Sequence, residues 1–309
     1  MERMARGDVG APLPLTGRYA VQGAQVRAGL ELWTRHTGAR LVLLDDCSDP
    51  RQAARLHEDL VAGGCRFVLG PYGSDSTRAV ARARAGRVVW NHGAAADDVQ
   101  RLPGVVSVPS PASRYLVALG RAVARLSPGA HVAVEAAPGR FARFACEELQ
   151  REAAVLGLRL VSKPTKADAV LYCGPLEWEL ERFRLREPGL LLGGVSPGLA
   201  AFAQLLGDDP EGLLAPVQWH PDLRVESELG PVTIGLEDYV AAQAYAACLI
   251  AERCVELEPT NPLAVARRLR TTTFFGGFEL GPDGLQVGHH LSAVQWREGR
   301  RELLLAHAV

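Results

Sequence analysis

Small and hydroxyl-bearing residues gather in the stretch GPYGSDST, residues 70–77. An apolar run precedes it and a helical pattern follows, so Ser74 and Thr77 would lie at a helix N-terminus among backbone N–H groups that have no helical partner. Three kinds of chemistry suit such a turn. It could cradle a phosphate, carry a nucleophilic serine, or bind a carboxylate or carbonyl without reacting.

Two of these chemistries lack the residues that they need. A phosphate-binding P-loop has the pattern GxxxxGK[ST], but GPYGSDST has no lysine, and the chain's only lysines are Lys163 and Lys166. A nucleophile elbow has the pattern GxSxG, whereas Ser74 lies in GSDST and no base is indicated for it. We therefore favour ligand binding, beside the structural alternative that Ser74 only caps the following helix.

A second candidate loop, WNHGAAADDV, follows the next expected strand and should lie beside the first loop, because the carboxyl ends of parallel strands share one edge of a sheet. His92 could be a ligand, a base or a metal residue. No other metal-ligating set is near, which favours a structural hydrogen bond. Gly93, Ala94, Ala95 and Ala96 either let a ligand approach the backbone or pack the loop tightly. The sequence leaves both open.

Three aspartates occur in DDCSDP, residues 45–50. They resemble a carboxylate cluster, but the pattern is also that of a strand end followed by a helix start. In that interpretation Asp49 or Ser48 is the N-cap and Pro50 is the first helical residue. We favour this structural interpretation.

The remaining histidines and cysteines indicate no metal or redox site. His289 and His290 are adjacent, so in a strand they would point to opposite faces, and we expect them to be surface or hinge residues. None of the six cysteines forms a CxxC pair, so most are expected to be small buried apolar residues. Cys47 and Cys65 flank one strand–helix unit, which leaves a disulfide between them open. No cofactor is expected.

Length and charge limit the function classes. A chain of 309 residues that is 48% apolar suits two lobes of roughly 100–200 residues each. The formal net charge of −1 provides no field that would attract nucleic acid. The start MERMARGDVGAPLPLTG has no apolar signal-peptide segment, so the sequence as written predicts a cytoplasmic soluble protein, or a periplasmic or extracellular one if a leader was removed. Localisation is left open.

Hydrophobic periodicity predicts an α/β chain. The first half alternates short apolar runs with amphipathic helices, which predicts β-α-β units and a parallel sheet. A second series of the same kind follows PSPAS, and the chain ends in a β-ribbon with turns at GPDG and REGR. The expected helices are residues 21–36, one containing Ala53, Leu56 and Leu60, one after Ser74, and residues 115–126, 140–156, 236–256 and 262–270.

Four segments, in order and near the same spacings, resemble the type I periplasmic-binding proteins of the leucine/isoleucine/valine- and amide-binding branch: LPLTGRYAVQGAQVRAGLELW, LLDDCSDPRQAARLHEDLV, VLGPYGSDSTRAVA and VVWNHGAAADDV. The ending FGGFELGPDGLQVGHHLSAVQW is similar too. The resemblance implies two Rossmann-like lobes with parallel sheets and a three-crossover hinge. It places residues 1–110 and 231–276 in an N-terminal lobe, and residues 111–222 and 277–309 in a C-terminal lobe with the hinge ribbon.

The resemblance also implies a ligand site. Ser74 and Thr77 match positions that bind a ligand carboxylate, helped by backbone at Gly73, Ala94 and Ala95. The full set expected to line the site is Tyr19, Tyr72, Gly73, Ser74, Thr77, His92, Gly93, Ala94 and Ala95 in the first lobe, and Phe141, Cys173, Gly174, Val195 and Trp219 in the second, with Gln218 near the hinge.

The sequence departs from the family pattern at two places that matter for the ligand. Amino-acid binders usually carry a hydroxyl where this chain has Ala95 or Ala96, and a hydrogen bond to a charged group is worth ~1.5–3 kcal/mol. An α-ammonium group also needs an acidic partner, and only Glu177 and Glu179 are candidates. Both departures weaken the case for an ordinary α-amino acid.

The function that we expect is non-enzymatic. The protein would bind a small polar or amphipathic metabolite, such as an amino acid, an amide or a related organic acid, by hinge closure, as the substrate-binding component of an ABC transporter. The alternatives are a cytoplasmic ligand sensor or regulator, a hydrolase-type enzyme using Ser74, His92 or Cys173, and a lobe pair that only binds a regulatory partner. No nucleic acid is expected as a partner.

Overall fold

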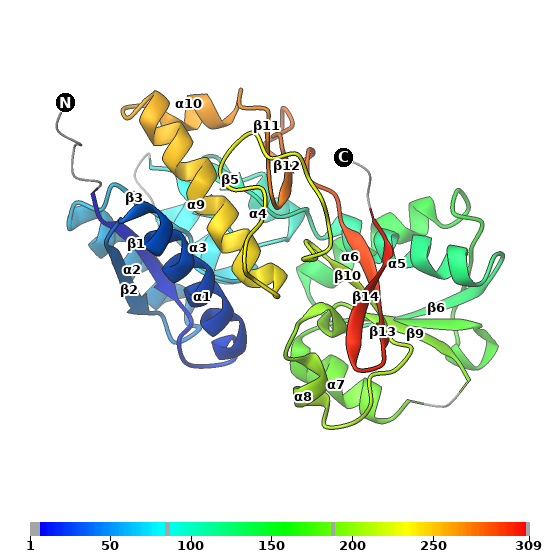
Figure 1. Ribbon diagram of the computed structural model, residues 1–309. Helices are drawn as coiled ribbons and strands as arrows, with labels where there is room; N and C mark the ends of the chain where they lie inside the picture. The colour runs from blue at the N-terminus through cyan, green and yellow to red at the C-terminus, as the bar shows by residue number, and fades with distance from the viewer. Residues whose placement is uncertain (1–6, 84–86, 187–188, 307–309) are drawn as a thin grey trace. The chain divides into compact units, whose positions relative to one another are not determined.

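The computed structural model describes residues 7–83, 87–186 and 189–306 (Figure 1). The chain forms two compact units, the first made of residues 1–110 and 224–289 and the second of residues 111–223 and 290–309. We describe each unit by itself.

The first unit contains a small parallel sheet. Strands β2, β1 and β3 lie in that order, β4 pairs with β5, and a parallel bridge between Leu69 and Trp90 connects the β3 and β4 segments. The strands are β1 (Val9–Leu13), β2 (Leu41–Asp45), β3 (Phe67–Val68), β4 (Val89–Asn91) and β5 (Val105–Ser107). The parallel β-α-β arrangement expected from the sequence is confirmed, and the carboxyl ends of these strands share one edge.

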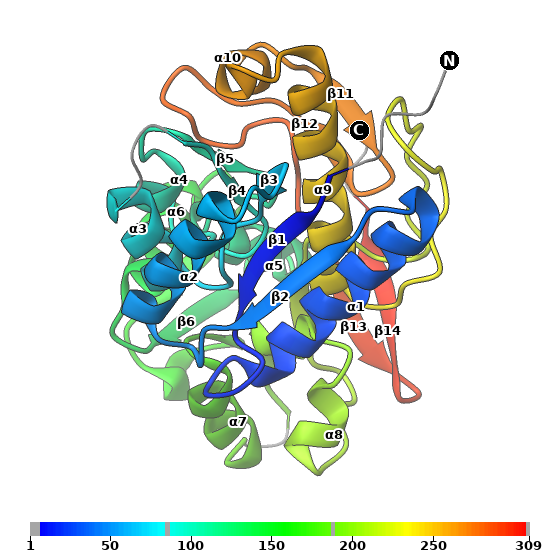
Figure 2. The same ribbon diagram turned by 90° about the vertical axis from the view of Figure 1, so that its left-hand side faces the viewer.

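Helices cover this sheet (Figure 2). They are α1 (Ala20–Thr37), α2 (Pro50–Ala62), α3 (Ser74–Ala83), α4 (Asp97–Gln100) and α9 (Tyr239–Leu257), and α10 (Pro262–Ala266) packs against α9. Helices α1 and α9 pack closely because Gly29 has no side chain: a Cβ there would lie 2.1 Å from the carbonyl oxygen of Ala241. The alanine-rich α9 is buried on nearly all faces, as this close packing requires.

The start of α2 shows how the aspartates of residues 45–50 are used. Asp49 Oδ1 accepts from the N–H groups of Arg51 and Gln52, at 2.9 and 2.8 Å, and Pro50 is the first helical residue. Asp45 accepts from backbone N–H groups at Leu15 and Cys47. The capping interpretation of Asp49 is therefore confirmed.

Residues 277–289 lie in the first unit, whereas the sequence interpretation assigned them to the second lobe. The reason is pairing: β12 (Gly276–Phe278) runs antiparallel to β11 (Thr271–Thr273). Gln286 also donates to the carbonyl of Val108 at 3.2 Å, and its N–H donates to Gln100. Residues 224–230 join the first unit in a similar way, because the N–H of Glu228 donates to Thr272 O at 3.1 Å.

The second unit is built on a seven-stranded sheet in the order β14-β13-β10-β9-β8-β6-β7. Five strands are parallel, β13 pairs antiparallel with β10, and β14 pairs antiparallel with β13. The strands are β6 (His131–Ala136), β7 (Arg159–Val161), β8 (Ala169–Cys173), β9 (Leu191–Gly194), β10 (Leu214–Val217), β13 (Ser292–Arg297) and β14 (Arg300–Leu305). The turn expected at REGR joins β13 to β14 through Glu298 and Gly299, which both have positive φ.

The core of the second unit lies between this sheet and its longer helices. Its buried residues include Leu119 of α5, Leu149 of α6 and Leu171 of β8. The helices are α5 (Ser113–Leu126), α6 (Arg140–Glu152), α7 (Leu176–Arg184) and α8 (Phe202–Leu206), with 3-10 turns η1 (Pro164–Lys166) and η2 (Ser196–Gly198). None of the helices in the described ranges is long and apolar enough to cross a membrane.

The structure also decides two expectations about individual residues, one for His289 and one for the pair Cys47 and Cys65. His289 is buried and stacks on Phe275 with ring centroids 4.4 Å apart, whereas His290 is exposed. Of the surface or hinge roles expected for this pair, the surface role does not apply to His289, and the boundary between the two units falls between the two residues. All six cysteines are free thiols, so Cys47 and Cys65 do not form the disulfide that the sequence left open.

Candidate functional site

The loops after β3 and β4 adjoin at the carboxyl edge of the first unit's sheet. The N–H of Gly70 donates to Trp90 O at 2.7 Å, and the N–H of Gly73 donates to Gly93 O at 3.3 Å. The adjacency expected from the sequence is confirmed. We refer to residues 70–74 as the serine loop and to residues 91–96 as the alanine loop.

Ser74 joins the two loops. It is the first residue of α3, and its Oγ accepts from the N–H of Ala96 at 3.1 Å. The hydroxyl proton of Ser74 donates to no group in the described part of the chain. Ser74 is half-buried, so this proton is available to a carboxylate or carbonyl oxygen.

Thr77, the second hydroxyl expected to bind the ligand, is fully buried. Its Oγ1 donates to the carbonyl of Pro71 at 3.1 Å, and its N–H donates to Gly73 O. Thr77 therefore stabilises the serine loop, and its bond to Pro71 would have to break before the hydroxyl could donate to a ligand.

Asn91, at the end of β4, organises the alanine loop. Its Oδ1 accepts from the N–H groups of Gly93 and Ala94, at 3.1 and 2.7 Å, and its Nδ2 donates to Ala94 O and to Ser107 Oγ. The N–H of Ala94 is therefore already bonded to Asn91. The next residue, Ala95, is half-buried, and its N–H has no internal partner among the described residues. Sequence reasoning missed Asn91, although an asparagine directly before a small-residue loop is a recognisable signal.

His92 has a structural role. It is fully buried, and its Nε2 lies 2.8 Å from the carbonyl of Gly70, so the Nε2 proton is the donor. Burial lowers the pKa of His92 to about 4, and the ring is neutral at pH 7. The described residues contain no cluster of three histidine, cysteine or acidic side chains suited to a metal ion.

Two tyrosine rings lie at this edge. Tyr19 and Tyr72 contact edge to face with centroids 5.6 Å apart. A Cβ on Gly73 would lie 3.2 Å from the Tyr19 ring, and a Cβ on Gly93 would lie 2.5 Å from the Tyr72 ring. The two glycines therefore make room for the two rings.

The candidates of the second unit lie at the carboxyl edge of its own sheet. Phe141 contacts Tyr115 edge to face at 4.9 Å, Cys173 and Gly174 end β8, and Val195 follows β9. Trp219 is buried two residues after β10, beside Gln218, whose Nε2 donates to Tyr115. The structure thus brings the expected residues of each unit to that unit's strand ends.

Glu179 of α7 connects the loops after β8 and β9. Its carboxylate accepts from the N–H groups of Gly174, Val195 and Ser196, at 2.9, 3.3 and 2.7 Å. Burial raises the pKa of Glu179 to about 7, against the opposing effect of these hydrogen bonds. Glu179 is completely buried, whereas Glu177 is exposed. The sequence suggested Glu179 only as a partner for an ammonium group and gave no sign of this structural role.

The geometry does not favour the hydrolase alternative. Within the first unit, Ser74 and His92 do not hydrogen-bond to each other in the described part of the chain. Burial raises the pKa of the Cys173 thiol well above its ordinary value, so this group stays protonated and is a poor nucleophile.

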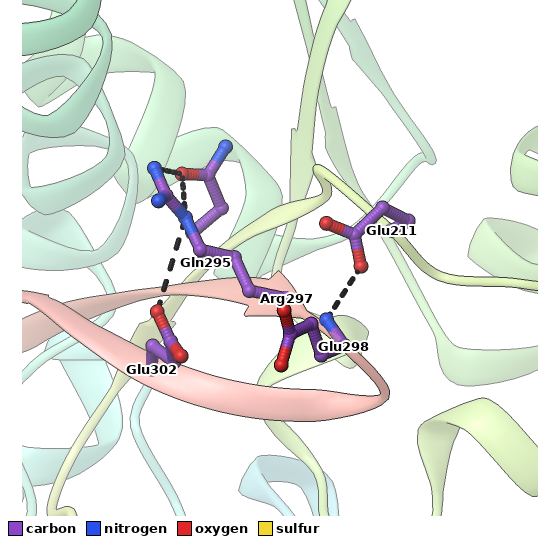
Figure 3. Close-up of a pocket in the computed structure, with 5 residues that line it drawn as sticks. All are labelled: Glu211, Gln295, Arg297, Glu298 and Glu302. Carbon is purple, nitrogen blue, oxygen red and sulfur yellow. Dashed lines mark hydrogen bonds and ion pairs between the residues drawn. The ribbon is translucent and has the colours of Figure 1, made fainter.

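A separate polar pocket lies on the β13–β14 hairpin (Figure 3). Its lining side chains bind one another: Arg297 donates to Gln295 at 3.2 and 3.0 Å and lies 3.9 Å from Glu302. Glu211 accepts from the N–H of Glu298. These groups are satisfied internally, so the pocket provides no argument for a ligand.

Two α/β units, each with helices around a largely parallel sheet and with small and polar residues at the strand ends, define a ligand-binding class of protein. Within this class, the chain belongs to the periplasmic binding protein family, whose sequence profile matches residues 8–169, more than half of its length. It is a family of binding proteins, in agreement with the expectation that the chain is not an enzyme.

Individual relatives agree with this assignment. The Leu/Ile/Val-binding protein homolog 1 of Brucella abortus is 33% identical over 78 residues, and the match covers 22% of this chain and only 21% of that relative. The branched-chain amino acid transporter substrate-binding protein of Streptococcus pneumoniae, solved with isoleucine, is 14% identical with a TM-score of 0.77 and covers 96% of this chain and 97% of that one. A solute-binding protein of an ABC transporter from R. palustris, solved with 4-hydroxybenzoate, is 17% identical with a TM-score of 0.74 and covers 95% and 94% of the two chains. The type I periplasmic-binding-protein fold is confirmed.

Proposed function

We propose that this protein is the solute-binding component of an ABC transporter and captures a small organic carboxylate at the edge formed by the serine and alanine loops. Family membership and two similar structures, one solved with isoleucine and one with 4-hydroxybenzoate, support this role. The hinge closure implied by the resemblance stays a prediction.

The observation that carries the proposal is the set of donors without internal partners. The Ser74 hydroxyl and the N–H of Ala95 lie on loops that are bonded to each other through Ser74 Oγ and Ala96. The first-turn N–H groups of α3 add to these donors and favour an anion by about 0.3–1 kcal/mol. Such donors form stronger hydrogen bonds with an ionised group, such as a carboxylate, than with a neutral one.

The proposal is tested by calorimetric titration of amino acids, amides and aromatic acids into the protein and into Ser74→Ala. We expect at least one carboxylate to bind, and Ser74→Ala to weaken it by about 10- to 150-fold, the equivalent of ~1.5–3 kcal/mol. Ser162→Ala, an exposed serine after β7, is the control and should change nothing.

Thermal unfolding of both variants separates lost affinity from lost folding, because Ser74→Ala also removes the bond to Ala96. A panel in which no compound binds would contradict the proposed function. Binding that is unchanged in Ser74→Ala would contradict this location for the site.

A further inference from the structure

The rings of Tyr19 and Tyr72, at the carboxyl edge of the first unit's sheet, are not ordinary core residues. The large core aromatics Trp33, Phe183 and Phe274 are almost completely buried, whereas Tyr19 and Tyr72 are only half-buried. Their contact with each other and with the loops at Gly73 and Gly93 holds both rings in fixed positions. Ring surface is thus presented at the strand ends, beside the free hydroxyl of Ser74.

The second unit, taken by itself, repeats this arrangement. The ring of Trp178 lies over Gly174, directly after β8: a Cβ on Gly174 would be 2.6 Å from it. Trp178 and Phe141 are both half-buried. Aromatic residues make up only 6% of the chain, so their presence at the strand ends of both units is notable. Each edge offers flat apolar surface to a ligand.

Three of the carboxylates that could hold an α-ammonium group are already used. Glu179 accepts three backbone N–H groups in the second unit. In the first unit Asp45 accepts from Leu15, Thr16 and Cys47, and Asp98 is bonded to Arg78 at 3.0 Å. Asp75 directly follows Ser74 and is exposed in the first turn of α3. It has no internal partner among the described residues.

The charge next to the tyrosine rings is positive instead. The guanidinium of Arg18 lies 4.4 Å from the centre of the Tyr19 ring, and Arg18 also bonds to the Tyr19 hydroxyl. His92 is neutral at pH 7 and adds no charge. A ring with a carboxylate matches this edge, and a ligand that also carries an ammonium group does not.

We propose that the ligand is an aromatic carboxylate without an α-ammonium group, bound by its ring at Tyr19 and Tyr72 and by its carboxylate at Ser74. This inference rests on the proposed function and specifies its ligand class. Tyr19 and Tyr72 determine the preference for a ring. The preference against an amino acid follows from the internal bonds of Glu179, Asp45 and Asp98 and from the positive charge of Arg18 beside the Tyr19 ring.

Four probes separate the two preferences. In calorimetric titration, 3-(4-hydroxyphenyl)propionate and L-tyrosine differ only in the ammonium group, as do 4-methylpentanoate and L-leucine. We expect the hydroxyphenyl acid to bind at least about tenfold more tightly than each of the other three. If L-tyrosine or L-leucine binds as tightly or more tightly, the inference is overturned while the proposed function stands. If neither these probes nor the wider panel binds, both fail.

Variants test the residues. Tyr72→Leu should weaken the hydroxyphenyl acid by about two- to twelvefold and leave the aliphatic acid unchanged, because only the ring–ring contact is lost. Tyr72→Phe keeps the ring and should keep the affinity, which distinguishes this effect from unfolding. Phe144→Leu is the matched control, since Phe144 is another half-buried ring and lies on the body of α6. Two results would overturn the inference. In the first, Tyr72→Leu weakens the hydroxyphenyl acid and the aliphatic acid equally. In the second, L-tyrosine binds more tightly than the hydroxyphenyl acid, and Asp75→Asn abolishes that advantage.

Discussion

In the first unit, the loops at the strand ends are held by Asn91 and His92, which are neutral at pH 7, whereas in the second unit they are held by the ionisable Glu179. Both arrangements satisfy buried backbone groups next to the candidate ligand residues. An amide provides donors and acceptors without charge, but a buried carboxylate accepts several N–H groups at the cost of desolvation. The comparison indicates opposite pH dependences: the second unit's loops lose stability as pH rises toward 7, where Glu179 ionises, whereas the first unit's loops lose stability as pH falls from about 6.5 toward 4, where the buried His92 would have to take up a proton.

The largest expected effect comes from removing Glu179. Glu179→Ala leaves the N–H groups of Gly174, Val195 and Ser196 without their acceptor in a buried place, and each such group costs ~1–3 kcal/mol. Because the ionised carboxylate itself carries a desolvation cost, we expect a net loss of ~3 kcal/mol in the free energy of unfolding. Urea denaturation followed by circular dichroism measures it. Glu177→Ala, an exposed neighbour, is the control, and an equal loss in the two variants would contradict this role.

The next effect is the pH dependence that Glu179 causes. Its pKa is raised from 4.5 to about 7 in the folded protein, so the unfolded chain releases this proton first as pH rises. The stability due to the protonated form is complete below pH ~4.5 and is lost as pH rises through about 7, by ~3 kcal/mol in all. Glu179→Gln resembles the protonated form and should flatten the unfolding free energy over this window. An unchanged slope in Glu179→Gln would rule out Glu179 as the source.

Asn91→Asp would bring the same behaviour into the first unit. The carboxylate still accepts from Gly93 and Ala94 but no longer donates to Ala94 O and Ser107 Oγ. We expect a loss of ~2 kcal/mol at pH 7 that partly recovers toward pH 4, since a buried carboxyl prefers its neutral form. Ser107→Ala removes one partner without adding a charge and should cost ~1 kcal/mol with no pH dependence. A pH-independent loss in Asn91→Asp would show that charge is not the reason.

The sequence predicted much of the fold but only part of the site. Strands and helices followed from periodicity, and the Asp49 cap followed from its neighbours, because these signals are local. The role of Glu179 depends on which backbone N–H groups surround it after folding, and no spacing rule contains that information, whereas Asn91 had a local signal that was not used. The burial of His289 was missed for the same reason as the role of Glu179, since it comes from stacking on Phe275, fourteen positions away in sequence. Tyr19 and Tyr72 were found only through the family resemblance.

The smallest expected effect comes from Asp46, a buried acid of the first unit that does not hold a candidate ligand loop. Its Oδ1 accepts from Ser48 at 2.8 Å and its Oδ2 has no partner in the described residues. Burial raises the pKa of Asp46 from 3.8 to about 6, so its contribution to stability falls as pH rises from ~4 to 6.

Asp46→Asn keeps the bond to Ser48 and removes the charge, but its new Nδ2 also lacks an acceptor. We therefore expect a gain of only ~1 kcal/mol at pH 7 and none at pH 4, measured by urea denaturation. Asp49→Asn is the control, since asparagine caps a helix as well as aspartate does. If the Asp46→Asn variant is less stable than the native protein at pH 7, the charge of Asp46 has a stabilising partner. The first unit would then also depend on a buried charged carboxylate.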